Sequence, residues 1–145
     1  MSDTTVYVDS NVFIRPLISD EDHTKGAISC KRVLSAIENG EVVAYTSTLT
    51  WDEVVYVVAR ILGRPDAIQA GEKFQRFPNL RFISVSDDII RLAQKLVSES
   101  DVLPRDAIHA ASALSRKVDV LVSDDSDFDA IPGVKRESSQ DFSHT

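Results

Sequence analysis

Four acidic residues lie where strands should end or helices should begin, each beside apolar sequence: Asp9, Glu53, Asp106 and Asp125. A carboxylate at the edge of an apolar core is costly unless a partner or a metal ion compensates its charge. Carboxylate oxygens are the ligands that Mg²⁺ and Mn²⁺ prefer. If the fold gathers these four side chains, the sequence therefore predicts an oxygen-rich site for Mg²⁺ or Mn²⁺.

The first two acids each have a structural alternative. Asp9 could cap the helix that follows it, but Asn11 could do the same, so the cap does not require Asp9. Glu53 closes a capping box that begins at Thr50. If the helix instead begins near Thr48, Glu53 lies one turn inside an almost entirely apolar helix and should face a partner or a cleft.

Asp106 has the strongest structural alternative. Pro104 suits the first position of a helix, so Asp106 falls in the first turn, where the helix dipole favours an acid. The small apolar residues 107–111 indicate that this helix packs closely against something. His109 in that stretch is expected to be a buried, hydrogen-bonded histidine rather than a metal ligand.

Four acids crowd into the seven residues Ser123–Asp129. The usual meaning of such a cluster is a solvated acidic turn. This one directly follows an apolar strand and contains Phe128, which should anchor the loop inward. Like charges this dense repel one another unless a cation binds, so the cluster favours a functional role.

Short apolar runs alternate with amphipathic stretches along the chain, which predicts a single-domain three-layer α/β/α sandwich, residues 1–145, with a central and mainly parallel sheet. Sites in such folds lie beyond the carboxyl ends of the strands. The predicted strands are 5–8, 42–45, 80–85 and 118–122, with an edge strand at 133–136. The predicted helices are 24–38, 48–62, 65–77, 86–99 and 104–116, with a helical turn at 125–130.

Three details of these elements are also predicted. Pro16 should disturb or end a short helix that starts at Asn11. The helix 48–62 is apolar on most sides, so it should be buried, with Trp51 in the core. The polar residues 138–145 could fray.

The bulk composition narrows the function classes. A net charge of −7 argues against a protein that coats polyanions, although bound cations could invert the local field for a nuclease. One cysteine excludes an internal disulfide and a thiolate metal site. The start has no signal-peptide pattern, and no apolar stretch is long enough to span a membrane. The chain is expected to be soluble and cytoplasmic.

Four segments occur in an order that resembles the PIN-domain ribonucleases, in particular the VapC-type toxins of prokaryotic toxin–antitoxin pairs. They are Val6–Ile14 (VYVDSNVFI), Glu53 early in a long helix, Arg105–Ala111 (RDAIHAA) and Leu121–Phe128 (LVSDDSDF). The resemblance covers essentially the whole chain. It implies an α/β/α sandwich, a small antitoxin that inserts a basic residue into the acidic pocket, and a homodimer.

The resemblance also implies roles for individual residues. The implied acidic quartet is Asp9, Glu53, Asp106 and Asp125. Asp127 matches an additional metal-binding acid, Ser123 a hydroxyl that orients the first acid, and Asn11 a supporting polar position. Asp124 is the alternative to its neighbour Asp125 as the fourth acid of the quartet.

The leading hypothesis is an endoribonuclease in which the quartet holds Mg²⁺ or Mn²⁺ and activates water to cleave RNA. The sequence contains no Ser, Cys or His arrangement for a protein nucleophile, which fits this chemistry. Cations near the cleft would hold the RNA, and by sequence proximity the candidates are Arg15, Arg60, Arg64 and Arg105.

Two alternatives remain. A haloacid-dehalogenase-like phosphatase would use Asp9 as nucleophile, Asp124 and Asp125 as metal acids, Ser47 as the phosphate-binding hydroxyl and Lys117 as the cation. That class usually has an aspartate where this chain has an asparagine, two residues after the nucleophile. A non-catalytic acidic module that binds a partner protein is the third hypothesis.

Overall fold

The computed structural model describes residues 4–19 and 25–142. In this part of the chain five strands form one parallel sheet in the order β3-β2-β1-β4-β5. The strands are β1 Thr5–Val8, β2 Val43–Ser47, β3 Leu80–Ile83, β4 Val120–Val122 and β5 Arg136–Glu137. The predicted parallel α/β architecture is confirmed, with the first strand of the chain at the centre of the sheet.

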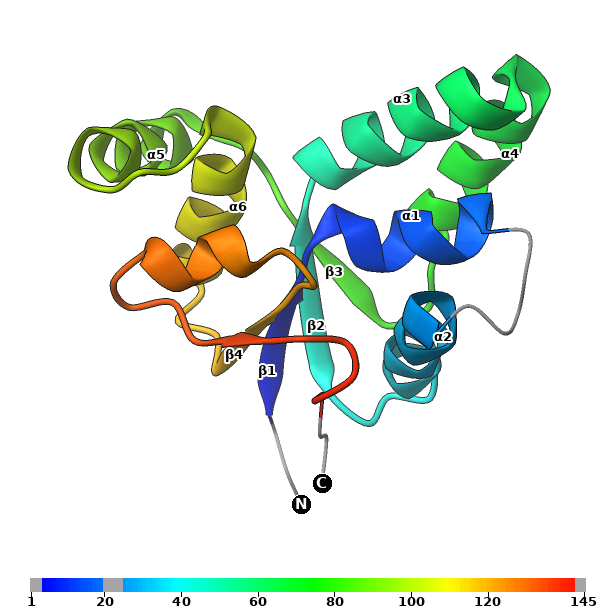
Figure 1. Cartoon of the computed structure of the whole chain (residues 1–145), viewed down its shortest axis with the longest axis horizontal. Coiled ribbons are helices and arrows are strands. Elements are labelled where there is room, and N and C mark those ends of the chain that lie inside the picture. The colour runs from blue at the N-terminus through cyan, green and yellow to red at the C-terminus, as the bar shows by residue number, and fades with distance from the viewer. Residues whose placement is uncertain (1–3, 20–24, 143–145) are drawn as a thin grey trace.

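Helices cover both faces of the sheet (Figure 1). The described helices are α1 Ser10–Ile18, α2 Lys25–Glu38, α3 Leu49–Leu62, α4 Arg64–Gln75, α5 Asp87–Glu99 and α6 Pro104–Ser115, with a short 3₁₀ helix, η1, at Ser126–Ala130. Figure 1 shows α1 to α4 on one side, and α5, α6 and η1 on the other. The result is the predicted α/β/α sandwich.

The central strand explains why its sequence is apolar throughout. Val6 and Val8 belong to the core under α1 to α4, whereas Tyr7 belongs to the core under α5 and α6. Successive side chains of a strand point to opposite faces of the sheet, so a strand covered on both faces buries every residue. Tyr7 therefore lies fully buried with its polar hydroxyl inside the protein.

The register of the sheet aligns the strand ends that carry the candidate residues. Val8 of β1 pairs with Val122 of β4, so Asp9 and Ser123 follow neighbouring strands side by side. The Asp9 amide donates to the Val122 carbonyl (3.0 Å), which continues the ladder past the end of the strand. Both polar residues therefore project from the carboxyl edge of the sheet, where sites in such folds are expected.

One of two expectations about the helices is wrong. Pro16 lies inside the first helix, which ends two residues later at Ile18, in line with the expected effect of a proline on a short helix. The helix α3 is not buried on most sides: Trp51 is 44% and Tyr56 is 53% exposed. Only the stripe of α3 that contains Val54 and Val58 faces the core. The rest of the helix surface stays exposed although the helix is strongly apolar.

The bounds of the last strand also need correction. The last strand lies at Arg136–Glu137 rather than 133–136, because Gly133 takes a left-handed turn conformation (φ 85°) before the strand. Within the segment predicted to fray, Ser139 is buried and Phe142 contacts the core, whereas Gln140 and Asp141 are exposed. Residues 143–145, and Thr24 at the predicted start of a helix, lie outside the described residues.

Among the described residues, no helix is both long enough and apolar enough to cross a membrane.

Candidate metal centre

Asp9 is a buried carboxylate at the end of the central strand. Its side chain caps the start of α1, where Oδ1 accepts a hydrogen bond from the Ser10 amide (2.8 Å). The Ser123 hydroxyl donates to Oδ2 at 2.7 Å. Burial raises the pKa of Asp9 above its ordinary value, although His109 and the hydrogen bonds from Ser123 and Ser10 act in the opposite direction. Asp9 does cap a helix, yet its second oxygen belongs to a network beyond that helix.

Ser123 uses its full hydrogen-bonding capacity at this edge. Besides donating to Asp9, its Oγ accepts from the Asp125 amide (3.0 Å) and from Asn11 Nδ2 (3.3 Å). A hydroxyl offers one donor and two acceptor positions, so all three are occupied. Ser123 therefore contacts Asp9, the acid that the resemblance implies it orients, and Asn11 bonds to Ser123.

Glu53 and Asp9 meet at one imidazole. His109 Nε2 lies 2.5 Å from Glu53 Oε1 and 3.5 Å from Asp9 Oδ1. The other ring nitrogen, Nδ1, lies 2.6 Å from the Tyr7 hydroxyl. Burial alone would lower the pKa of His109, but the contacts with Tyr7, Glu53 and Asp9 raise it well above the ordinary value. The expectation of a buried, fully partnered histidine agrees with this geometry.

Asp106, Asp125 and Asp127 form a second group of acids. One carboxylate oxygen from each lies within 4.8 Å of the others. Asp106 comes from the first turn of α6, whereas Asp125 caps η1 through the Asp127 amide (2.9 Å). Burial, and then repulsion from Asp125 and Asp9, raise the pKa of Asp106 from 3.8 to about 6. The influence of Asp9 on Asp106 shows that the two groups of acids are neighbours.

We call these five residues the acidic edge: Asp9, Glu53, Asp106, Asp125 and Asp127. They come from five different elements or junctions, and the carboxyl ends of the strands bring them together. The donor atoms are carboxylate oxygens, which suit Mg²⁺ or Mn²⁺ and not a thiolate-binding metal. Burial and repulsion from neighbouring acids both disfavour the charged form of Asp106, and a bound cation would offset both, so these residues fit a divalent metal ion.

Asp124 points away from the acidic edge. Its Oδ2 accepts from Arg15 (2.7 Å) and the Ser139 hydroxyl (2.9 Å), and its Oδ1 accepts from the Ser139 amide (2.7 Å). These bonds join α1 to the segment after β5. Because both of its oxygens are engaged there, the geometry favours its neighbour Asp125 as the metal-facing acid.

The four candidate RNA-binding arginines differ in position. Arg105 directly precedes Asp106 and is exposed. Arg15 is engaged with Asp124. Arg60 bonds to Tyr56 and lies about 10 Å along α3 from Glu53, given a rise of about 1.5 Å per residue. Arg64 lies farther still, beyond the end of α3, in the first turn of α4. Arg105 is therefore the candidate beside the acidic edge.

The contacts of two side chains, Tyr7 and Arg136, escaped the sequence analysis. The Tyr7 hydroxyl touches His109 and accepts from the Ser47 amide (3.1 Å). Arg136 donates to the Ser123 carbonyl (3.0 Å) and holds Asp129 through two further bonds. A tyrosine inside a buried strand is a signal of such a contact, because a buried hydroxyl needs a partner.

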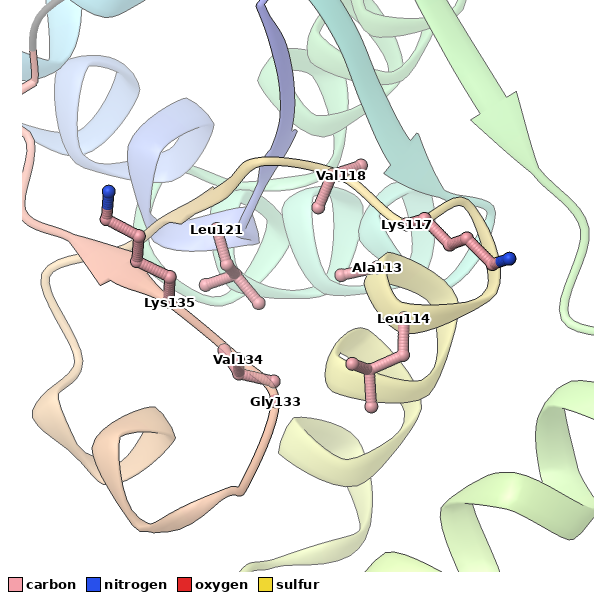
Figure 2. Close-up of a pocket in the computed structure, with 8 residues that line it drawn as sticks. All are labelled: Ala113, Leu114, Lys117, Val118, Leu121, Gly133, Val134 and Lys135. Atoms are coloured by element: carbon pink, nitrogen blue, oxygen red, sulfur yellow. The ribbon is translucent and has the colours of Figure 1, made fainter.

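A pocket of about 270 Å³ lies at the other end of the sheet (Figure 2). It is lined by the end of α6, the start of β4 and the segment 133–135. Figure 2 shows that Lys117 and Lys135 point outward on opposite sides of an apolar floor, which includes Leu114 and Leu121. Small-molecule sites usually have convergent polar groups, and this pocket has none among its lining residues.

Comparison with known proteins identifies the family of the chain. A family model described as "PIN domain" matches residues 6–134. Ribonuclease VapC2 of Methanocaldococcus jannaschii is 20% identical over 140 residues, which covers 88% of this chain and 89% of that protein.

Solved structures share the fold at low identity. The DNA-bound VapBC of Salmonella typhimurium contains a chain with a TM-score of 0.72 and 18% identity, covering 94% of this chain and 98% of that one. VapC20 of Mycobacterium tuberculosis, described as a toxin that cleaves the sarcin–ricin loop, gives a TM-score of 0.70 and 18% identity, covering 86% and 93%.

Proposed function

The chain belongs to the PIN-domain family, and on this basis we propose that it is an endoribonuclease that uses Mg²⁺ or Mn²⁺ at the acidic edge. The observation that carries the proposal is the convergence of five carboxylates, three of them within 4.8 Å, at the carboxyl edge of the sheet. The raised pKa of Asp106, caused first by burial and then by repulsion from Asp125 and Asp9, adds that a charged carboxylate is unfavourable there without a cation. The relatives named as ribonucleases support RNA as the substrate.

Asp106, Asp125 and Asp127 would hold the metal ion, with Asp9 and Glu53 completing the site. When bound, Mg²⁺ or Mn²⁺ lowers the pKa of water and offsets negative charge on a scissile phosphate. Ser123 fixes Asp9 by its 2.7 Å hydrogen bond, and His109 fixes Glu53. Arg105, beside Asp106, is the side chain best placed to contact an RNA phosphate.

We extend the proposal to a toxin of a toxin–antitoxin pair, with a small antitoxin as partner and a homodimer as the working form. The support is the surface of α3 and α4, where Trp51, Tyr56 and Ile68 are large, apolar and exposed. Exposed apolar groups that gather on one surface usually mark a protein interface. Sedimentation velocity of the purified chain tests the dimer: a monomer at micromolar concentration would remove it.

The geometry gives no support to the phosphatase alternative. Asp124, one of its metal acids, is bound to Arg15 and Ser139. Lys117, its cation, precedes β4 and so lies at the opposite edge of the sheet from Asp9. A non-catalytic acidic module remains the alternative, and the activity assay separates it from the nuclease.

The deciding experiment measures RNA cleavage with Mn²⁺ in the wild type and in Asp9→Asn and Asp125→Asn. We expect each substitution to reduce cleavage at least about 100-fold, because each replaces a charged oxygen ligand by a neutral amide. Asp88→Asn, at an exposed acid on α5 that pairs with Arg91 and not with the acidic edge, is the matched control and should keep full activity. Folded Asp9 and Asp125 variants that cleave within twofold of the wild type would refute the assignment.

A further inference from the structure

A buried chain of hydrogen bonds connects the backbone of β2 to the acidic edge. The Ser47 amide donates to the Tyr7 hydroxyl (3.1 Å), which lies 2.6 Å from His109 Nδ1. His109 Nε2 then lies 2.5 Å from Glu53 Oε1. Tyr7, Ser47 and His109 are all at most 1% exposed. These hydrogen bonds thus connect the end of β2, through the buried Tyr7 and His109 side chains, to the carboxylate of Glu53.

The donor of the last bond is fixed by chemistry. An ionised carboxylate only accepts hydrogen bonds, so His109 Nε2 carries the hydrogen and donates it to Glu53. This holds for the neutral ring and for the charged ring. The Tyr7 hydroxyl adapts, since it can donate to a neutral ring or accept from a charged one. The contact with Glu53 therefore does not depend on the charge of His109.

The position of the ring is also fixed. Tyr7 belongs to the central strand, and its aromatic ring packs edge-on against the imidazole, with 5.7 Å between the ring centres. The Ser47 amide holds the Tyr7 oxygen in turn. His109 itself cannot serve as a metal ligand in this arrangement, because both of its ring nitrogens already face partners.

A glutamate held through one oxygen presents the other in a defined direction, whereas a free glutamate samples many rotamers. We propose that His109 is a positioning residue, itself oriented by Tyr7, that holds Glu53 for the divalent metal ion of the acidic edge. At 3.5 Å, the same Nε2 faces Asp9 Oδ1, so one imidazole lies between two of the acids. The inference rests on the proposed function for the presence of that metal.

The test measures the dissociation constant for Mn²⁺ alone, from the electron paramagnetic resonance signal of free Mn²⁺, in folded protein. His109→Leu should weaken binding about 10–100-fold, the range typical when the hydrogen-bond partner of a metal ligand is lost. His109→Gln keeps an N–H donor toward Glu53 and should recover most of the affinity. Ser112→Ala, which removes a buried hydroxyl from the same helix without touching the chain of hydrogen bonds, should bind like the wild type.

Tyr7→Phe is the second variant, because it keeps the ring packing and removes only the hydroxyl. We expect it to weaken Mn²⁺ binding several-fold. This variant tests the proposal even if His109→Leu does not fold. Two results would overturn the proposal: Tyr7→Phe and His109→Leu binding within twofold of the wild type, or His109→Gln binding no better than His109→Leu. The second result would mean that the imidazole only fills space.

The outcomes for this inference and for the proposed function are distinct. A wild-type chain that binds Mn²⁺ but cleaves no RNA refutes the nuclease and leaves the positioning role open to the same affinity measurement. A wild-type chain that cleaves RNA, with variants that bind Mn²⁺ normally, refutes the positioning role alone. A wild-type chain that binds no Mn²⁺ refutes both.

Discussion

Replacing Asp106 by Asn should stabilise the metal-free protein while it impairs the metal-bound one. Asp106 has its pKa raised from 3.8 to about 6, first by burial and then by Asp125 and Asp9. An acid with a raised pKa in the folded state destabilises the fold when it is ionised. That cost is fully present above pH 6 and is absent below pH 3.8, where the carboxyl is protonated in both states.

The size of the effect follows from the pKa. A rise from 3.8 to about 6 corresponds to roughly 3 kcal/mol at about 1.4 kcal/mol per pKa unit. Asp106 is only half-buried, so solvent screening reduces this to about 1 to 1.5 kcal/mol. The favourable interaction of an acid with the start of α6, about 0.5 kcal/mol, is lost with the charge. The net gain should be about 0.5–1 kcal/mol, or roughly 2–3 °C in melting temperature.

The assay is thermal unfolding of the wild type and of Asp106→Asn, with EDTA and with saturating Mn²⁺. In EDTA at pH 7.5 the variant should melt higher, and the difference should shrink as the pH falls from 6 towards 4. With Mn²⁺ the order should reverse, because a ligand at 100 times its dissociation constant stabilises its protein by about 2.7 kcal/mol. Asp88→Asn, at an exposed position of α5, should change neither result.

The prediction has two refuting outcomes. A variant that melts lower than the wild type in EDTA at pH 7.5 would show that ionised Asp106 is not repelled by its neighbours. A gain that stays constant between pH 4 and 8 would show that the stabilisation does not come from removing a charge.

Two further substitutions separate the acidic edge from the elements around it. Asp124→Asn should destabilise the fold by about 1.5–3 kcal/mol in urea unfolding, which is the range for hydrogen bonds to charged groups. It should leave the Mn²⁺ affinity within twofold of the wild type. A large loss of affinity would instead place Asp124 in the metal site. Phe128→Ala should destabilise the fold by about 3–5 kcal/mol, because the ring is fully buried beneath η1. It should also weaken Mn²⁺ binding, because η1 contains Asp127 and is capped by Asp125. Normal affinity in the folded variant would show that η1 keeps its position without the Phe128 ring.

The strand ends could be predicted from the sequence, and with them the positions of Asp9 and Asp125. An apolar run that gives way to acidic sequence marks the carboxyl end of a buried strand. In the structure Asp9 directly follows β1, and Asp125 lies three residues after the last residue of β4. The order of the strands could not be predicted in this way. Which strand lies beside which depends on packing over the whole sheet, and that order alone sets Ser123 against Asp9.

Side-chain direction was the other missing information. Asp124 and Asp125 are adjacent residues of the same type, so the sequence does not distinguish them. The turn after β4 directs Asp124 towards Arg15 and Asp125 towards Asp106. The apolar residues of α3 gave the opposite error. The hydrophobic composition of α3 predicted that the helix is buried. An apolar helix can have the same composition and still leave one face exposed, as α3 does at Trp51.

The hydrogen bonds divide the acidic edge into two parts with different electrostatic demands. Asp9 and Glu53 have partners within the protein, since Ser123 and His109 donate to them. In the described part of the chain, no cationic side chain bonds to Asp106, Asp125 or Asp127. Burial, and then repulsion from Asp125, Asp9 and Asp127, raises the pKa of Asp106. A divalent ion would therefore gain most of its electrostatic stabilisation from this second group. The first group, held in place before any ion arrives, would set the geometry of the site.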